Sequence, residues 1–178
     1  AQDGRFLAWA AYSPASMIRA RAWSFDETER IDADFFARRI GRALALRARL
    51  PIDSDAVRLI HGEADALPGL IVDRYGDTLS GLTRLYERSD SGVRGLEGLP
   101  AQRGWLRGQG PTEITIREHG WQLTLDVAEG HKTGYYLDQR DNRQRFAQWV
   151  RHFGCQRVLN CYSYTGGFSV AALAGGAQ

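Results

Sequence analysis

The chain has 178 residues, of which 43% are hydrophobic and 25% are charged, and its formal net charge is +2. This balance is typical of a globular protein and argues against intrinsic disorder. The sequence has no apolar run long enough to span a membrane and its first residues do not form a signal peptide, so we expect a soluble cytoplasmic protein.

Residues 5–25 alternate loosely between apolar and polar types, with a break at Ser13-Pro14. This pattern predicts two strands of a barrel or sheet whose other strands are absent. Asp32 can then cap a helix that ends before Pro51 and carries apolar residues at Phe35, Phe36, Ile40, Ala43, Leu44 and Leu50. The helix also carries arginines, which form either a solvated face or a stripe that faces RNA: Arg38, Arg39, Arg42, Arg47 and Arg49.

The middle of the chain has the pattern of short strands joined by turns. Residues 57–77 predict a strand, a turn and a second strand, and residues 112–127 predict a hairpin that turns at Glu118-His119-Gly120. Residues 100–110 are rich in Gly and Arg and predict a loop. Together these segments indicate a small α+β domain.

After Gly130 the pattern becomes that of an α/β fold. Asp138 or Asp141 is expected to open a helix that ends at Gly154 and has an apolar face formed by Phe146, Trp149, Val150 and Phe153. A short buried strand at 157–161, a glycine turn at 164–167 and an apolar helix at 168–174 are predicted to follow. A lone strand and helix cannot bury both faces, so we expect this domain to be incomplete in the chain.

The two cysteines, Cys155 and Cys161, flank the predicted strand. Extended chain would hold them about 20 Å apart, which is too far for a disulfide, so we expect reduced thiols. No Cys/His cluster accompanies them, so we expect no metal site. We interpret Cys161 as a small core residue rather than a nucleophile.

Two motifs indicate ligand binding. In the turn at 164–167 the glycines allow close approach of the backbone, and the following helix offers free N–H groups to a carboxylate or phosphate, although a plain α/β connection fits too. The segment from Gly130 to Arg143 combines glycines, aromatic rings that can cover an adenine or sulfonium group, and polar side chains. A capped helix start with solvated charges is its alternative.

Lys132 is the only lysine in a chain whose other basic residues are arginines. Its retention indicates either a need for a compact point charge or chance. The mild net basicity is compatible with a nucleic acid partner but does not require one.

With these motifs the chain resembles the ribosomal RNA large-subunit methyltransferase I family. The resemblance rests on residues 131–140 and 159–168, and continues upstream through 11–16, 62–70 and 86–90. It implies that residues 1–30 are the end of a PUA RNA-binding domain, that 31–128 are a central α+β domain, and that 129–178 begin a Rossmann-like methyltransferase domain.

The resemblance also implies an enzyme that uses S-adenosylmethionine to form 5-methylcytosine in 23S ribosomal RNA, with a homodimer left open. Family enzymes add a cysteine thiolate to C6 of cytosine, which activates C5 toward the methyl group. That cysteine is expected beyond Gln178, so no catalytic residue is assigned here and we expect the fragment to be inactive. The cofactor-binding residues that the resemblance implies are Lys132, Tyr136, Asp138, Gln139, Arg140, Asn160, Tyr162, Tyr164, Thr165, Gly166, Gly167 and Phe168.

The chain departs from the family near Leu79-Ser80, where a stretch of strand and helix is expected to be missing. Three alternatives remain open at this point. A methyltransferase that acts on transfer RNA would share both motifs, whereas a non-catalytic RNA-binding module would bind RNA without the cofactor. A dinucleotide oxidoreductase fits least, because the Gly-x-Gly-x-x-Gly fingerprint is missing.

Overall fold

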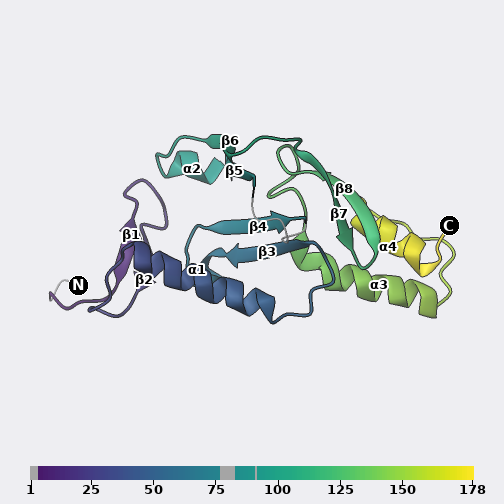
Figure 1. Cartoon of the computed structure of the whole chain (residues 1–178), viewed down its shortest axis with the longest axis horizontal. Helices are drawn as coiled ribbons and strands as arrows, with labels where there is room; N and C mark the ends of the chain where they lie inside the picture. Colours follow the sequence, from purple (N-terminus) through teal and green to yellow (C-terminus); the bar gives the residue numbers. More distant parts are fainter. Residues whose placement is uncertain (1–3, 77–82, 91) are drawn as a thin grey trace. The chain divides into compact units, whose positions relative to one another are not determined.

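A computed structural model describes residues 4–76, 83–90 and 92–178 of the chain (Figure 1). These residues divide into two compact units, each considered by itself below. The first comprises residues up to Pro51 with Arg58–Asp73 and Leu85–Leu106, and the second comprises Ile52–Val57, Arg74–Arg84 and Arg107–Gln178. The three domains expected from the sequence are not tested by this division and stay a prediction. The stretch expected to be missing near Leu79-Ser80 lies outside the described residues.

The first unit contains short antiparallel pairs of strands and one long helix. Strands β1 (Trp9–Tyr12) and β2 (Ala20–Ser24) pair antiparallel, which confirms the two strands predicted for residues 5–25. Helix α1 (Ala33–Ala48) is followed by β3 (Ala56–His61), the 3-10 helix η1 (Gly62–Asp65) and β4 (Ile71–Tyr75). Strands β3 and β4 form one sheet, and their arrows run in opposite directions in Figure 1, as the predicted strand, turn and strand require.

Helix α1 begins as its sequence predicts, but two of the apolar residues predicted for it, Leu44 and Leu50, are 41% and 49% exposed. The Asp32 carboxylate accepts a hydrogen bond from the Phe35 amide at 3.0 Å, so it caps the helix. The apolar face of the helix lies against the β3–β4 sheet, through a core of Ala43, Ile60 and Leu67 with Trp23, Phe36, Ile40, Leu59 and Val72 around it.

The loop predicted for residues 100–110 is wrong, because β6 (Gln102–Arg107) occupies most of that segment. β6 pairs with β5 (Leu85–Ser89), and the short helix α2 (Gly92–Leu96) lies between them in sequence. The rings of Tyr86 and Trp105 pack edge to face, with their centroids 5.0 Å apart. Pairing with a distant strand thus overrides the local effect of Gly104, whose φ of +147° favours a turn or bulge.

The second unit is built on the predicted hairpin. Strands β7 (Glu113–Glu118) and β8 (Trp121–Asp126) pair antiparallel from Glu113 opposite Asp126 to Glu118 opposite Trp121. His119 and Gly120 both have positive φ, as a two-residue turn of the I′ type requires. The inward face of the hairpin joins a core of Ala56, Ile116, Leu123, Leu125, Tyr135 and Leu137.

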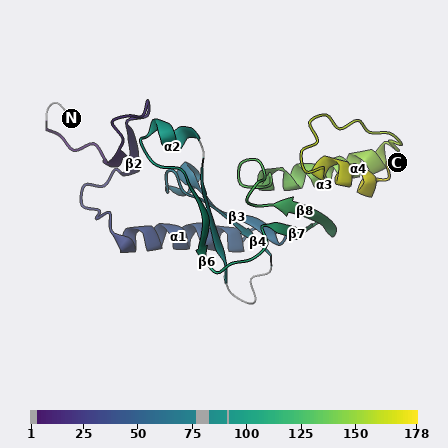
Figure 2. The same ribbon diagram turned by 90° about the horizontal axis from the view of Figure 1, so that it is seen from above.

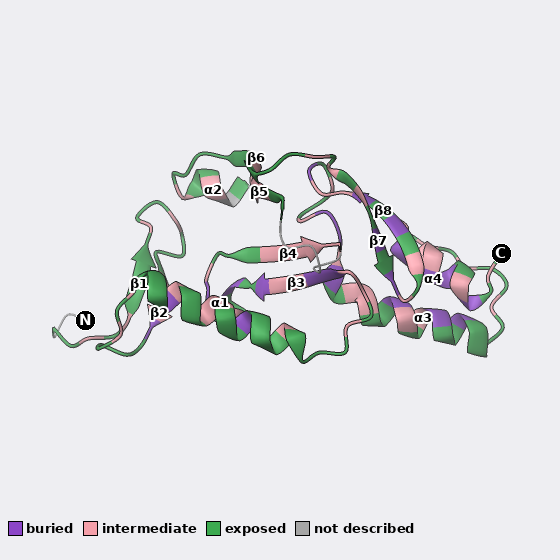
Figure 3. Ribbon diagram, viewed as in Figure 1, coloured by how far each residue is buried: buried purple, intermediate pink, exposed green. Residues whose placement is uncertain are grey.

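Two helices complete the second unit, and they lie side by side in both views (Figures 1 and 2). A 3-10 turn, η2 (Leu137–Gln139), leads into α3 (Arg140–His152), and α4 (Gly167–Gly175) follows. The helices approach so closely that a Cβ on Gly175 would lie 2.6 Å from the Ala147 carbonyl oxygen. Figure 3 shows buried residues on both helices and on the hairpin.

The details predicted for α3 are partly wrong. Gln139 rather than an aspartate stands at its N-cap, without a side-chain hydrogen bond, because the preceding 3-10 turn already orders the backbone there. The buried residues are Arg143, Ala147 and Val150, whereas Trp149 and Phe153 of the predicted apolar face are 61% and 71% exposed.

The strand predicted at residues 157–161 is also wrong, because these residues have no strand conformation and Leu159 is 88% exposed. A strand needs a hydrogen-bonded partner, and none of the described strands pairs with this segment. Cys161 is exposed, so its interpretation as a core residue is wrong as well. Cys155 and Cys161 are free thiols, as predicted.

The observed architecture is mixed α/β, which confirms the fold class at that level. In the part of the chain that the structure describes, no helix is both long enough and apolar enough to cross a membrane. The PUA remnant and the Rossmann-like arrangement remain predictions.

Candidate cofactor site

The structure brings the two predicted motifs into direct contact. The Tyr164 hydroxyl donates to the Gly134 carbonyl at 3.0 Å and reaches the His131 carbonyl at 3.3 Å. The rings of Tyr164 and Tyr136 lie edge to face with centroids 5.7 Å apart, and the Tyr136 hydroxyl is 3.0 Å from Nδ1 of His131. An aromatic cluster of His131, Tyr136 and Tyr164 therefore joins the polar segment to the glycine turn.

Lys132 lies at the edge of this aromatic cluster. Its Nζ is 5.3 Å from the centroid of the Tyr136 ring, within the range of a cation–π contact. The side chain is exposed and the backbone has a φ of +55°, which a residue with a Cβ adopts at a cost. The ammonium group is thus free to reach a ligand from the aromatic cluster.

Asp138, Gln139 and Arg140 each make a hydrogen bond with a residue close in sequence. Gln139 donates to Asp138 at 3.1 Å and accepts from Asn142 at 2.9 Å, while Arg140 donates to Asp141 at 2.8 Å. The bond from Arg140 holds the pKa of the Asp141 carboxyl below its usual range. Asp138 is exposed and keeps its second carboxylate oxygen for a ligand.

The glycine turn presents the start of α4. Gly166 occupies the N-cap position with a φ of +75°, a conformation that suits glycine, and supplies no side-chain cap. No side chain caps the first N–H groups of the helix, which lie at the positive end of its dipole, where an anion can bind. Thr165 is half-buried beside this turn.

The remaining predicted residues have separate positions. Asn160 donates to the Ser169 hydroxyl at 2.9 Å, which ties the segment before the turn to α4. The ring of Phe168 packs on Phe146 with centroids 5.7 Å apart. The Tyr162 side chain is fully exposed and is not brought to the aromatic cluster.

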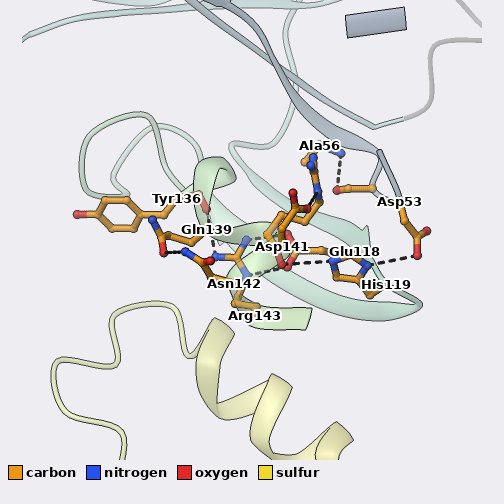
Figure 4. A network of polar contacts seen from close by, with 11 residues as sticks. Asp53, Ala56, Glu118, His119, Tyr136, Gln139, Asp141, Asn142 and Arg143 are labelled. Atoms are coloured by element: carbon orange, nitrogen blue, oxygen red, sulfur yellow. Dashed lines mark hydrogen bonds and ion pairs between the residues drawn. The ribbon is translucent and has the colours of Figure 1, made fainter. Parts of the chain in front are cut away.

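A buried ion pair behind the site was missed by the sequence analysis. Arg143 binds Glu118 through two parallel hydrogen bonds, Nε to Oε1 at 2.6 Å and Nη2 to Oε2 at 2.7 Å, and both side chains are 2% exposed or less (Figure 4). The Arg143 Nη1 also donates to the Tyr136 carbonyl at 3.1 Å. Two signals were available: Glu118 shares the inward face of β7 with Ile114 and Ile116, and Arg143 shares the spacing of Ala147 and Val150 on α3.

Tyr135 and His119 extend this polar network. The Arg143 guanidinium lies 4.4 Å from the centroid of the Tyr135 ring, and burial raises the pKa of the Tyr135 hydroxyl. The His119 ring lies between the Asp53 carboxylate and the Arg140 carbonyl, at 3.3 Å from each. The hairpin turn thus contacts Arg140 through His119 and Arg143 through Glu118.

No group of His, Cys, Asp and Glu side chains suited to hold a metal ion occurs among residues 4–76, 83–90 and 92–178. The groups at the site are aromatic faces, neutral amides, a carboxylate and backbone N–H groups. This set suits an organic ligand that carries an aromatic ring and charged groups.

Comparison with known proteins agrees with such a ligand. Residues 99–178 match the sequence profile of S-adenosylmethionine-dependent methyltransferases. Nearly the whole chain is similar to proteins named Ribosomal RNA large subunit methyltransferase I, with 45% identity over 97% of the chain in Erwinia tasmaniensis, 43% over 100% in Aliivibrio fischeri and 44% over 98% in Escherichia coli O139:H28. The chain spans about half the length of these relatives, 50%, 51% and 50% respectively.

Solved structures share the fold. A Streptococcus mutans protein assigned as a SAM-dependent methyltransferase superposes with a TM-score of 0.74 at 24% identity, over 96% of this chain and 50% of its own. A crystal structure of a protein assigned as a methyltransferase, complexed with SAH, gives a TM-score of 0.75 at 24% identity, over 96% of this chain and 49% of its own. These likenesses concern the fold alone.

Proposed function

The chain is related over nearly its whole length to about half of the ribosomal RNA large subunit methyltransferase I protein, and from this relationship we propose that it is part of an S-adenosylmethionine-dependent methyltransferase of ribosomal RNA. The proposal extends to 5-methylcytosine formation in 23S ribosomal RNA in the cytoplasm. The structural observation that supports cofactor binding is the contact between the two motifs, in which the Tyr164 hydroxyl of the glycine turn donates to the carbonyl of Gly134.

The residues at the site fit the proposed cofactor chemically. A helix start with outward N–H groups suits the carboxylate of its methionine part, and aromatic faces suit its cationic sulfur or its adenine. Asp138 is an exposed acceptor for an ammonium or hydroxyl group. The cofactor would supply an electrophilic methyl group.

We assign the residues of this chain to binding and orientation. Gly166 allows the backbone approach, while Asn160 and Phe168 hold the start of α4 from behind through Ser169 and Phe146. The full proposed set is Lys132, Tyr136, Asp138, Gln139, Arg140, Asn160, Tyr162, Tyr164, Thr165, Gly166, Gly167 and Phe168.

The substrate part of the proposal concerns the rest of the protein. Activation of cytosine C5 needs a nucleophile that adds to C6, and we assign this step to a cysteine outside this chain rather than to Cys155 or Cys161. The target base must be unstacked to react, which favours single-stranded or looped RNA. The proposed PUA remnant at residues 1–30 would contribute to RNA binding.

Cofactor binding can be tested by titration calorimetry of the intact protein with S-adenosylmethionine. We expect Gly166→Val and Asp138→Ala each to weaken binding by about tenfold or more, because one strains the turn at positive φ and the other removes an acceptor. Gly176→Val is the matched control, since Gly176 also has a positive φ but follows the opposite end of α4. Unchanged affinity in both site variants would overturn the assignment.

The substrate is tested separately by methylation of purified, unmodified RNAs. Label in 23S ribosomal RNA but not in transfer RNA is the expected result. Label in transfer RNA alone would favour the transfer RNA methyltransferase, and RNA binding without any cofactor binding would favour a non-catalytic module.

A further inference from the structure

The contacts of Arg143 link segments that are distant in sequence, and from them we infer that Arg143, held by Glu118, is a positioning residue for the cofactor site. The inference rests on the proposed function, because it concerns the geometry of the same site. Arg143 itself is buried and would act through Tyr136 and Gly167 rather than by touching the cofactor.

The first link runs from the hairpin to the polar segment. Glu118 ends β7 and fixes the guanidinium by two parallel hydrogen bonds. The third polar contact of the guanidinium holds the Tyr136 carbonyl (Figure 4). The guanidinium also lies over the Tyr135 ring. Arg143 therefore sets where the backbone of residues 135 and 136 lies relative to the hairpin.

The second link runs from Arg143 to the glycine turn. A Cβ on Gly167 would lie 2.9 Å from the Tyr135 hydroxyl and 3.0 Å from Cδ of Arg143, so the first residue of α4 rests directly on these two side chains. The Tyr135 hydroxyl is buried there without a hydrogen-bond partner among the described residues. A shift of Arg143 would thus move both Tyr136 and the helix start that is proposed to bind the cofactor.

Burying an ion pair costs the hydration free energy of two charges, which argues that this pair has a positional role. Apolar side chains of similar volume would fill the space without the loss of hydration that two buried charges suffer. They would not fix an orientation, whereas the planar guanidinium fork binds a carboxylate in one geometry and keeps an N–H for the Tyr136 carbonyl. Order in the site, rather than stability, is what the pair adds.

The test compares stability with cofactor affinity in the intact protein. The central variant is Glu118→Met/Arg143→Met, which replaces the pair by apolar side chains of similar size. We expect its midpoint of thermal unfolding to match or exceed that of the single variant Glu118→Met, which leaves Arg143 buried without its partner. We expect its Kd for S-adenosylmethionine to rise at least about tenfold, because small displacements of binding groups cost this much or more.

Arg143→Lys provides a second arm, since lysine keeps the charge but lacks the fork. It should fold and also bind the cofactor about tenfold more weakly. Arg38→Met is the control, because Arg38 is an exposed residue of the first unit that pairs with Glu29. The affinity of this variant for S-adenosylmethionine should equal that of the unaltered protein.

The outcomes separate the possibilities. Wild-type affinity in the folded double variant would overturn the positioning role, and if that variant does not fold, wild-type affinity in Arg143→Lys would do the same. Weakened affinity in a folded variant supports the role. If the unaltered protein binds no cofactor, the proposed function fails instead, whereas binding that none of the variants changes leaves that function intact and removes only this inference.

Discussion

Lys132 carries its positive charge on a compact ammonium group rather than on a planar guanidinium. Its ammonium lies over the Tyr136 ring, whereas an arginine there would present a planar, stacked guanidinium. Both residues carry a Cβ, so the backbone at a φ of +55° costs the same in each and the exchange isolates the head group. The only lysine of the chain is therefore suited to a clean test.

We expect Lys132→Arg to retain only part of the methyl transfer activity of the intact protein, with a decrease of roughly threefold to tenfold. Lys132→Gln, which removes the charge, should lose more. The measurement is the initial rate of label transfer to 23S ribosomal RNA. Full activity in Lys132→Arg would mean that the lysine is retained by chance.

At the scale of residues, the sequence predicted the polar segment and the glycine turn but not the pair behind them. Tyr136 and Tyr164 stand in motifs whose composition is unusual, so they can be found locally. Glu118 was assigned only to a turn, and Arg143 only to the polar segment that precedes a helix. Burial of a charge depends on its partner, which lies 25 positions away in the sequence.

Among the elements, α1 is held to η1 by an ion pair that should depend on pH. Arg47 binds both carboxylate oxygens of Asp65, with Nη2 to Oδ2 at 2.6 Å, and the two side chains are 14% and 7% exposed. The bond from Arg47 is the main reason that the pKa of Asp65 lies below its usual range, while burial acts in the opposite direction. The charged carboxylate therefore stabilises the fold.

Asp65→Asn should lower the free energy of unfolding at pH 7 by about 2 kcal/mol, the scale of hydrogen bonds to charged groups. Because the pKa of Asp65 is lowered by folding, this contribution is complete above the unfolded value near 3.9 and is lost as the pH falls through the lower folded value. The difference in free energy of unfolding between Asp65→Asn and the parent protein, measured with urea, should thus shrink below about pH 4. Asp34→Asn, an exposed change in the first turn of α1, should cost less than about 1 kcal/mol.

The elements that could be predicted are those whose signals are local. Alternation and the His119-Gly120 turn identify the β7–β8 hairpin, and Asp32 identifies the start of α1. The predictions for β6 and for the segment 157–161 were wrong in opposite ways: a loop was predicted where a strand forms, and a strand where none forms. The reason is the same in both cases, because a strand depends on its partner. β6 has a partner in β5 despite its glycine, and the apolar segment 157–161 has none among the described strands.

For the whole molecule, the second unit leaves several large apolar side chains uncovered. Trp149, Phe153, Leu159 and Leu173 are each at least 61% exposed in the described structure. The relatives are about twice as long as the stretch that this chain matches. The segment 157–161 pairs with none of the described strands, so no sheet of the described structure covers these side chains.

The same argument predicts that residues 1–178 alone do not transfer methyl groups. The start of α4 is proposed to contact a cofactor, but the segment before it pairs with none of the described strands, and the nucleophile that activates cytosine is proposed to lie elsewhere. The first unit has its own core around Ala43, Ile60 and Leu67 and should remain folded. Radiolabelled S-adenosylmethionine with unmodified 23S ribosomal RNA is the assay, run on this chain beside the full-length protein. Label incorporation by the chain at a rate near that of the full-length protein would refute the prediction, and replacement of Cys155 and Cys161 by serine would then show whether either thiol is the nucleophile.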